Sequence, residues 1–164
     1  MSYSWDDYFM TMVYLVASRS KDKRTHIGAV IVGPNREIRS TGYNGFVRGL
    51  NDDVPERQEK GEKQYWFEHA ERNALYNALL TQTSVLGCTM YTNGIPCEGC
   101  GRAIRQTGII EVVVDTKWEN LEERAEKNRR TLETFEETGI KLRYHDTNYI
   151  EIKKLNDGVV SPLE

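Results

Sequence analysis

The sequence has few cysteines and no long apolar run. Its 164 residues include three cysteines, an odd number. This count argues against the disulfide framework of a small secreted domain and favours a reducing compartment, so we expect a cytoplasmic location. The longest apolar runs, residues 29–32 and 112–114, are far shorter than the ~20 residues that cross a bilayer. The first ten residues lack the regions of a signal peptide. We therefore expect a soluble protein without a membrane partner.

An excess of positive charge is missing as well. Lysine and arginine number 22 against 25 acidic residues, for a net charge of −3. Proteins that bind duplex nucleic acid rely on a basic surface, so nucleic acid is not an expected partner. A hydrophobic content of 38% with 10% aromatics is too high for a disordered chain. The length suits one domain, and we expect residues 1–164 to form it.

Helices and strands can be assigned from the spacing of apolar residues. Residues 4–20 show helical periodicity, and two β-branched runs, at 27–33 and 37–43, flank a turn, which predicts a helix followed by a β-hairpin. Further helices are predicted at 68–80, 96–106 and 119–137, and further strands at 88–93, 109–115 and 140–144. The fold class expected is α/β, with a mixed five-stranded sheet between helices on both faces. The polar segment 44–64 is predicted to be irregular and functional.

Two short motifs carry the chemistry of the sequence. The first is His69-Ala70-Glu71 and the second is Pro96-Cys97-Glu98-Gly99-Cys100. Each is predicted to begin a helix. One imidazole and two thiolates suit Zn²⁺ and leave its fourth position open, which is the pattern of a catalytic site. The Cys-x-x-Cys spacing puts both sulfurs in the first helical turn, where the helix dipole favours thiolate.

Glu71 is the candidate acid–base residue of this site. It follows His69 by two positions, about 200° around a helix, so the two side chains do not share a lateral face. They can share a site beyond the helix end, between the N-termini of two helices. Glu71 would then lie beside the open position of the metal and could take a proton from water there.

Other interpretations of these residues have to be weighed. A Cys-x-x-Cys pair can be a redox pair or half of a structural zinc site, whose fourth ligand could be His26, Cys88 or His145. Cys88 lies in an apolar strand and is expected to be buried in the core. The redox interpretation leaves His69-Ala70-Glu71 unexplained. The five residues together favour a catalytic zinc site.

The motifs resemble those of the zinc-dependent cytidine/deoxycytidylate deaminase superfamily, whose signature is H-x-E followed by P-C-x-x-C. Segments 19–22, 27–32, 40–45, 69–74 and 108–109 are similar to those of its dCMP deaminases, and the similarity runs from about residue 5 to 115. The resemblance implies a cytidine-deaminase-like α/β/α fold. It also implies zinc ligands at His69, Cys97 and Cys100, with Glu71 as proton shuttle. The reaction implied is hydrolysis of dCMP to dUMP, the dTMP precursor, and ammonia.

The resemblance also implies contacts with a nucleotide substrate. Asn44 would hydrogen-bond the sugar 3′-hydroxyl, and the backbone amide of Ala70 would contact the pyrimidine carbonyl. For the phosphate, the basic loop 18–25 is the best candidate and Arg24 its first choice. Asn44 could instead serve only a turn, and the basic loop could simply be solvated. Trp66 and Phe67 could stack on the base or belong to the core.

Some features depart from the family pattern. Many dCMP deaminases have additional Cys or His residues before the His-Ala-Glu helix, but residues 45–68 have none, so one zinc per chain is expected. Gly101 and Val47 stand where alanine and proline are usual, which puts substrate detail and nucleotide regulation in doubt. A homo-oligomer, a hexamer, is implied by the family alone. Alternative functions are deamination of another cytosine compound or of a purine base such as guanine, and a non-catalytic zinc module.

Overall fold

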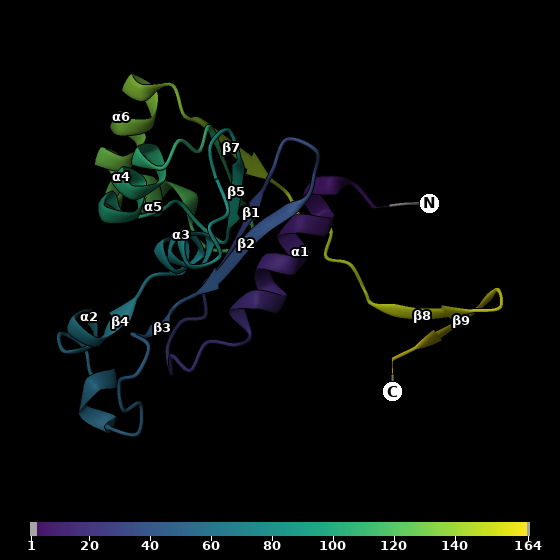
Figure 1. The fold of residues 1–164 in the computed structure, drawn as a ribbon, viewed down its shortest axis with the longest axis horizontal. Coiled ribbons are helices and arrows are strands. Elements are labelled where there is room, and N and C mark those ends of the chain that lie inside the picture. Colours follow the sequence, from purple (N-terminus) through teal and green to yellow (C-terminus); the bar gives the residue numbers. More distant parts are fainter. Residues whose placement is uncertain (1–2, 164) are drawn as a thin grey trace.

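The centre of the molecule is a mixed five-stranded sheet, here in a computed structural model that describes residues 3–163 (Figure 1). Its strand order is β2-β1-β5-β6-β7. The strands are β1 (Gly28–Val32), β2 (Ile38–Tyr43), β5 (Thr89–Thr92), β6 (Glu111–Asp115) and β7 (Lys141–His145). Strand β1 is antiparallel to both of its neighbours, whereas β5, β6 and β7 are parallel. The predicted sheet is confirmed.

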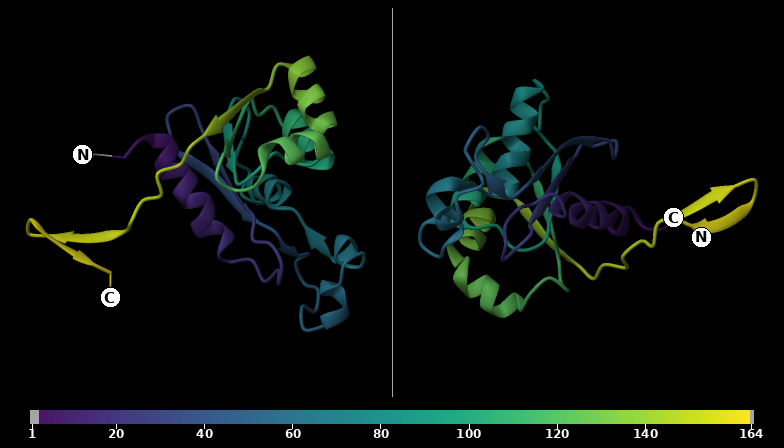
Figure 2. Two further views of the ribbon diagram at one scale, coloured as in Figure 1. Left: turned by 180° about the vertical axis from the view of Figure 1, so that it is seen from behind. Right: turned by 90° about the horizontal axis from the view of Figure 1, so that it is seen from below.

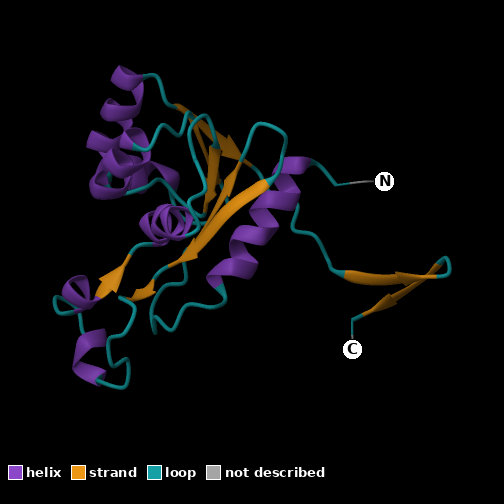
Figure 3. Ribbon diagram, in the orientation of Figure 1, coloured by secondary structure: helices purple, strands orange, loops and turns teal. Residues whose placement is uncertain are grey.

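Helices cover both faces of this sheet (Figure 3). Helix α1 (Trp5–Ala17) packs on one face, and α3 (Ala70–Leu80), α4 (Glu98–Gln106) and α6 (Arg129–Thr138) lie on the other. Every residue of β1 is buried, and its side chains alternate between the two hydrophobic cores. A strand buried on both faces reads as a continuous apolar run, which is why residues 28–32 carry no polar alternation. The three-layer α/β/α class is confirmed.

The charged helix predicted over 119–137 is two helices. Helix α5 (Leu121–Lys127) ends at Asn128, and α6 begins at the next residue. Asn128 is 4% exposed, and its Nδ2 donates to the carbonyl of Ile95 at 2.8 Å. This contact crosses 33 residues of sequence. The prediction of one helix was therefore wrong, because the periodicity of apolar residues does not reveal a long-range contact of this kind.

The segment predicted to be irregular forms a small lobe beyond the end of the sheet. Strand β3 (Gly45–Phe46) pairs with β4 (Phe67–Glu68), and a 3₁₀ helix, η1 (Pro55–Gln58), and helix α2 (Lys63–Trp66) lie between them. The Phe46 and Phe67 ring centroids are 4.2 Å apart. The lobe lies at the lower left of Figure 1, and its strand β4 is separated from α3 by His69 alone.

The chain beyond β7 first crosses α1 and then leaves the body. The backbone N–H of Asn148 donates to Asp7 Oδ1 at 2.8 Å, and that of Ile150 donates to Thr11 Oγ1 at 3.1 Å. A hairpin of β8 (Lys153–Asn156) and β9 (Val159–Pro162) follows and stands apart from the sheet in all views (Figure 2). It was not predicted. Within residues 3–163, no helix has the length and apolar content needed to cross a membrane.

Candidate active site

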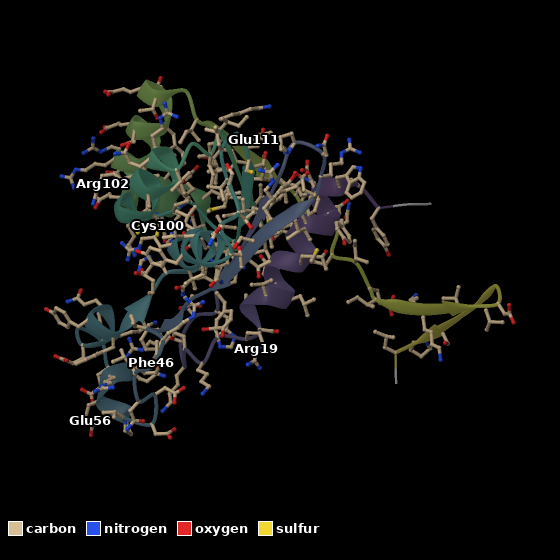
Figure 4. All side chains as sticks on the ribbon, in the orientation of Figure 1. Arg19, Phe46, Glu56, Cys100, Arg102 and Glu111 are labelled. Atoms are coloured by element: carbon tan, nitrogen blue, oxygen red, sulfur yellow. The ribbon has the colours of Figure 1, made fainter. Side chains whose placement is uncertain are left out.

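Two helix N-termini converge on one cluster of side chains. His69 is the residue immediately before α3 and Cys97 the one before α4, and Cys100 lies in the first turn of α4 (Figure 4). The Nδ1 atom of His69 lies 3.4 Å from Cys97 Sγ and 3.5 Å from Cys100 Sγ. The three ligand atoms are all within 4.8 Å of one another. The structure thus brings together the three residues that the sequence motifs single out.

Helix α3 is held on the sheet at close range. A Cβ atom on Gly42 would lie 2.2 Å from the backbone nitrogen of Ala74, so strand β2 tolerates only glycine beneath the helix. Ser40 Oγ donates to the carbonyl of Ala74, and Asn77 Nδ2 donates to that of Thr41, each at 2.7 Å. These contacts hold the middle of α3 on the sheet, and His69 immediately precedes the first residue of that helix.

The electrostatics of the cluster favour a bound cation. Hydrogen bonds from the Cys100 thiol and from His69 outweigh burial and lower the pKa of Cys97 to about 3. The hydrogen bond between the two cysteine side chains, together with burial, raises the pKa of Cys100. The hydrogen bond to Cys97 raises the pKa of His69. The pair of cysteines therefore gives up a first proton readily, which favours metal binding. One nitrogen and two sulfurs in this arrangement fit a tetrahedral zinc ion with one open position.

Glu71 lies directly beside the cluster. Its side chain is buried, with the residue 5% exposed, and its Oε2 accepts from the Cys100 thiol at 3.6 Å. Burial raises the pKa of its carboxyl group. A buried carboxyl group with a raised pKa next to a metal-binding set is a frequent arrangement of a general acid–base residue.

A cavity of about 830 Å³ opens over these residues, a size suited to a small ligand. His69, Ala70, Glu71 and Cys97 form its floor. Three further walls come from the loop 22–27 with Asn44, from the lobe, and from a segment after β6. Their lining residues include Asp22, Arg24, Thr25, His26, Ile27, Asn44, Gln58, Lys60, Lys63, Phe67, Trp118, Glu119, Arg124 and Lys127.

The predicted substrate residues Ala70, Arg24 and Asn44 all line this cavity. The amide of Asn44 is already engaged: Nδ2 donates to Asp22 Oδ2 and to the carbonyl of Thr25, each at 2.9 Å. Its Oδ1 accepts from the backbone N–H of Ile27 at 2.8 Å. Asn44 therefore fixes the loop 22–27, and its contact with a sugar stays a prediction, as do those of Ala70 and Arg24.

Two residues weighed as aromatic walls have different positions. Phe67 lines the cavity, but its ring packs against Phe46 and beneath the ammonium of Lys63, which is 5.2 Å from the ring centroid. Trp66 lies outside the cavity lining, and the Arg57 guanidinium stacks on it at 4.3 Å. Trp66 is half-buried, so its position matches neither of the two roles weighed for it, a stacking wall or a core residue.

The candidates for a fourth structural ligand lie elsewhere. Among residues 3–163, none of His26, Cys88 and His145 joins the cluster. Cys88 is fully buried in the core, as predicted. The ring of His26 contacts the carbonyl of Asp22 at 2.9 Å, and His145 Nε2 lies 2.9 Å from Asp7 Oδ1.

Sequence reasoning missed Asp22. It is 2% exposed, and its Oδ1 accepts from the backbone N–H groups of Arg24 and Thr25 at 2.9 and 3.3 Å. Its Oδ2 accepts from Asn44 and is paired with Lys63 of the lobe. An aspartate two residues before Arg24 is the signal of an Asx turn, and that signal could have identified it. Asp22 thus joins the loop, the sheet end and the lobe.

The comparison with known protein families agrees with this geometry. Residues 3–116 match the model of the cytidine and deoxycytidylate deaminase zinc-binding region. The chain, with its His-x-Glu and Cys-x-x-Cys motifs on two converging helix ends, therefore belongs to that family of zinc-binding deaminases. Its cofactor is zinc, for which His69, Cys97 and Cys100 provide the donor set.

The chain is also similar to individual proteins of this family. Human deoxycytidylate deaminase is 42% identical over 114 residues, 66% of this chain and 63% of the human protein. A probable deoxycytidylate deaminase of Drosophila melanogaster is 41% identical over 119 residues, with 66% and 58% covered. An uncharacterized deaminase of Aliivibrio fischeri is 36% identical over 143 residues, with 85% and 92% covered. The chain thus spans about 63% of the length of the first of these relatives.

Solved structures share the fold. The dCMP deaminase of cyanophage S-TIM5, in complex with dCMP and dUMP, superposes with a TM-score of 0.70 at 21% identity, covering 88% of this chain and 99% of its own. A diaminohydroxyphosphoribosylaminopyrimidine deaminase/reductase of Thermotoga maritima superposes with a TM-score of 0.58 at 21% identity, covering 85% and 36%. At these identities the likeness establishes the cytidine-deaminase-like fold.

Proposed function

We propose that this protein is a zinc-dependent hydrolase that converts dCMP to dUMP and ammonia, and so supplies the precursor of dTMP. The observation that carries the proposal is the buried Glu71 beside a His-Cys-Cys donor set on the floor of a nucleotide-sized cavity. The similarity to deoxycytidylate deaminases supports the choice of substrate.

In the mechanism that we propose, Glu71 moves the protons. His69, Cys97 and Cys100 would hold zinc, which supplies Lewis-acid activation of water when bound. Glu71 Oε2 takes one proton from the attacking water and delivers it to N3 of the cytosine ring. It then takes the second proton from the hydroxyl added at C4 and delivers it to the departing amine, which leaves as ammonia. Because burial raises the pKa of Glu71, its carboxyl group holds that proton more readily than an exposed one.

The substrate contacts that we propose use three cavity residues. The N–H of Ala70, the first residue of α3, has no acceptor within its helix and would bind the pyrimidine carbonyl. The guanidinium of Arg24 would bind the phosphate, because it has no ion-pair partner in the described part of the chain. Asn44 would meet the sugar 3′-hydroxyl through the remaining lone pair of Oδ1.

Ammonia release from a panel of compounds tests the reaction. The panel contains dCMP, CMP, dCTP, cytidine, cytosine, guanine and adenosine, and dCMP is expected to react fastest. An enzyme that releases ammonia from none of the cytosine nucleotides would contradict the proposal. Metal analysis of the purified protein is expected to give one zinc per chain, and a ratio near two would contradict the single site.

We also propose that residues 1–164 form one catalytic domain that assembles into a homo-oligomer, a hexamer, in the cytoplasm without a nucleic-acid partner. Exposed apolar side chains near the end of α3 and the start of β6 support self-association: Leu79, Leu80, Leu86 and Ile110 are 55–75% exposed. Light scattering coupled to size exclusion would give the mass, and a monomer would contradict the assembly.

A further inference from the structure

One wall of the cavity comes from outside the region that the family model covers. That region ends at residue 116, whereas Trp118, Glu119, Arg124 and Lys127 all line the cavity. Apart from the imidazole rings of His26 and His69, the aromatic residues of the lining are Phe67 and Trp118. Phe67 is 8% exposed and is enclosed by Phe46 and Lys63. Trp118 is half-buried and is therefore the large flat apolar surface available to a ligand.

Trp118 lies close to the segment that precedes the two metal-binding cysteines. A Cβ atom on Gly94 would be 3.0 Å from Cδ1 of Trp118 and 2.8 Å from a carboxylate oxygen of Glu119. Gly94 is three residues before Cys97 and lines the same cavity. The absence of a side chain at position 94 thus lets the indole reach the loop that leads into α4.

Two tyrosines support Trp118: Tyr14 of α1 packs against it, and Tyr149, in the segment after β7, packs against Tyr14. The Tyr14 ring centroid lies 6.0 Å from that of Trp118, and the Tyr149 ring meets Tyr14 edge-on at 5.1 Å. The hydroxyls of Tyr14 and Tyr149 both donate to Oδ2 of Asp115, which is fully buried. Asp115 Oδ1 accepts from the backbone N–H of Lys117 at 3.0 Å, which fixes the turn that carries Trp118.

Lys117 links the same turn to the segment after β7 a second time. Lys117 Nζ donates to the carbonyl of Thr147 at 2.5 Å and is paired with Asp146 at 2.9 Å. The turn 116–118 is therefore held between α1 and residues 146–149. A pyrimidine ring that is hydrogen-bonded along its edge leaves its two faces free. An aromatic side chain can stack on such a face.

We propose that Trp118 is the wall on which the pyrimidine ring of the substrate stacks, and that Tyr149, acting through Asp115 and Tyr14, is its positioning residue. This inference rests on the proposed function and names a specificity-determining residue for the same site. The wall belongs to the part of the chain that lies beyond the family match.

Tryptophan fluorescence tests the stacking without turnover. The chain has three tryptophans, Trp5, Trp66 and Trp118, and only the last lines the cavity. Titration of the zinc-loaded protein with dUMP is expected to quench its emission. The variant W118F should lose this quenching, whereas W5F and W66F should retain it. Full quenching in W118F would overturn the inference.

Kinetics with dCMP provide a second measurement. W118A is expected to lower kcat/KM by about 10- to 100-fold, from the usual strength of base–aromatic stacking, and W118F should recover most of it. An unchanged kcat/KM in W118A, with active wild type, would overturn the wall but leave the proposed function intact. Conversely, a wild type that deaminates no cytosine nucleotide but shows the Trp118-dependent quenching would overturn only the function.

The positioning role of Tyr149 has its own test. In a protein that carries W5F and W66F, emission reports Trp118 alone. Adding Y149F is expected to shift this emission to longer wavelength and to raise KM for dCMP about threefold or more, with kcat less affected, since the pairing lost is of the order of one hydrogen bond. Equal emission and equal KM with and without Y149F would overturn the positioning role. Circular dichroism confirms that each variant is folded.

Discussion

The chain divides into two regions that build the site in different ways. Residues 3–116 match the family model and provide the cluster of His69, Cys97 and Cys100 with Glu71. Residues after 116 provide Trp118, Glu119, Arg124 and Lys127, which form one wall of the cavity. The first region places its residues by short motifs at helix ends. The second places them by contacts between segments far apart in sequence.

The two regions also differ in what holds them in place. Strands β1, β5 and β6 and helix α3 are fixed by apolar side chains of two buried cores. Polar contacts add to the anchoring of the turn 116–118 and of α5. Asp115 Oδ1 accepts from the backbone N–H of Lys117, and Asn128 Nδ2 and Arg124 Nε both donate to the carbonyl of Ile95, at 2.8 and 3.1 Å. Hydrogen bonds depend steeply on geometry. The wall can thus be altered by single polar substitutions that leave the metal cluster intact.

The largest effect is expected from C100A, which tests whether the cysteines of the first region hold the zinc. Removal of one of three donors should reduce zinc content from about one per chain to near zero and abolish ammonia release. The matched control is C88A, because Cys88 is buried in the core away from the cluster. Metal analysis of both variants decides the matter, and a zinc-replete C100A would contradict the ligand set.

E71Q separates metal binding from proton transfer within the same region. Loss of the carboxyl group should lower kcat by about 10²- to 10⁴-fold, the usual contribution of a general acid–base residue. Zinc content should stay at the wild-type value, because Glu71 lies outside the donor set. Ammonia release and metal analysis on one preparation provide both values. Wild-type turnover in E71Q would refute the proton-shuttle role.

N128A tests the polar anchoring of the second region. The substitution removes one donor from the buried carbonyl of Ile95 and should lower the free energy of unfolding by ~1–2 kcal/mol. N120A is a control on the same pair of helices: Asn120 is exposed and caps α5 by accepting from Glu122 and Glu123. Its loss should cost ~1 kcal/mol or less. Urea denaturation measures both, and a larger loss in N120A would contradict this account.

The smallest effect concerns acid stability through Asp7, which joins α1 to the segment after β7. Burial alone would raise the pKa of Asp7, but hydrogen bonds from Ser4, the Asn148 amide and His145 outweigh it and lower the pKa to about 2. Since the unfolded value is about 3.9, this contribution is fully present above pH ~4. It is lost as the pH falls toward 2.

Denaturation from pH 5 to pH 2 measures this contribution. The wild type should lose ~1–2 kcal/mol more than D7N over this interval. Parallel pH dependence of the two proteins would show that Asp7 is not the responsible group.

The sheet and its helices were predictable because their signals are local. The β-branched runs within strands 28–32 and 111–115 predict strands because they are short, continuous and apolar. The metal cluster was predictable for the same reason, since His69 and Cys97 each lie one residue before a helix. Spacing within a motif is sufficient to place such residues on a helix end.

The remaining features depend on contacts that no local pattern records. The break at Asn128 follows from its bond to Ile95, 33 residues earlier. Trp118 lines the cavity but was not singled out, because it lies in neither of the two sequence motifs. The pairing of Asp22 with Lys63 likewise joins a loop to a lobe that was predicted to be irregular.

The bond between Asp7 and its partners also has a consequence for biosynthesis. His145 and Asn148 follow Asp7 by 138 and 141 residues. At a synthesis rate of roughly 5–20 residues per second, α1 emerges about 7–30 s before these partners exist. The acidic end of α1 is then without its neutralising contacts, although its apolar face can already meet β1. We expect Trp118 to reach its final position only after these contacts of Asp7 have formed, so the protein would acquire its metal-binding residues earlier in synthesis than its complete cavity wall.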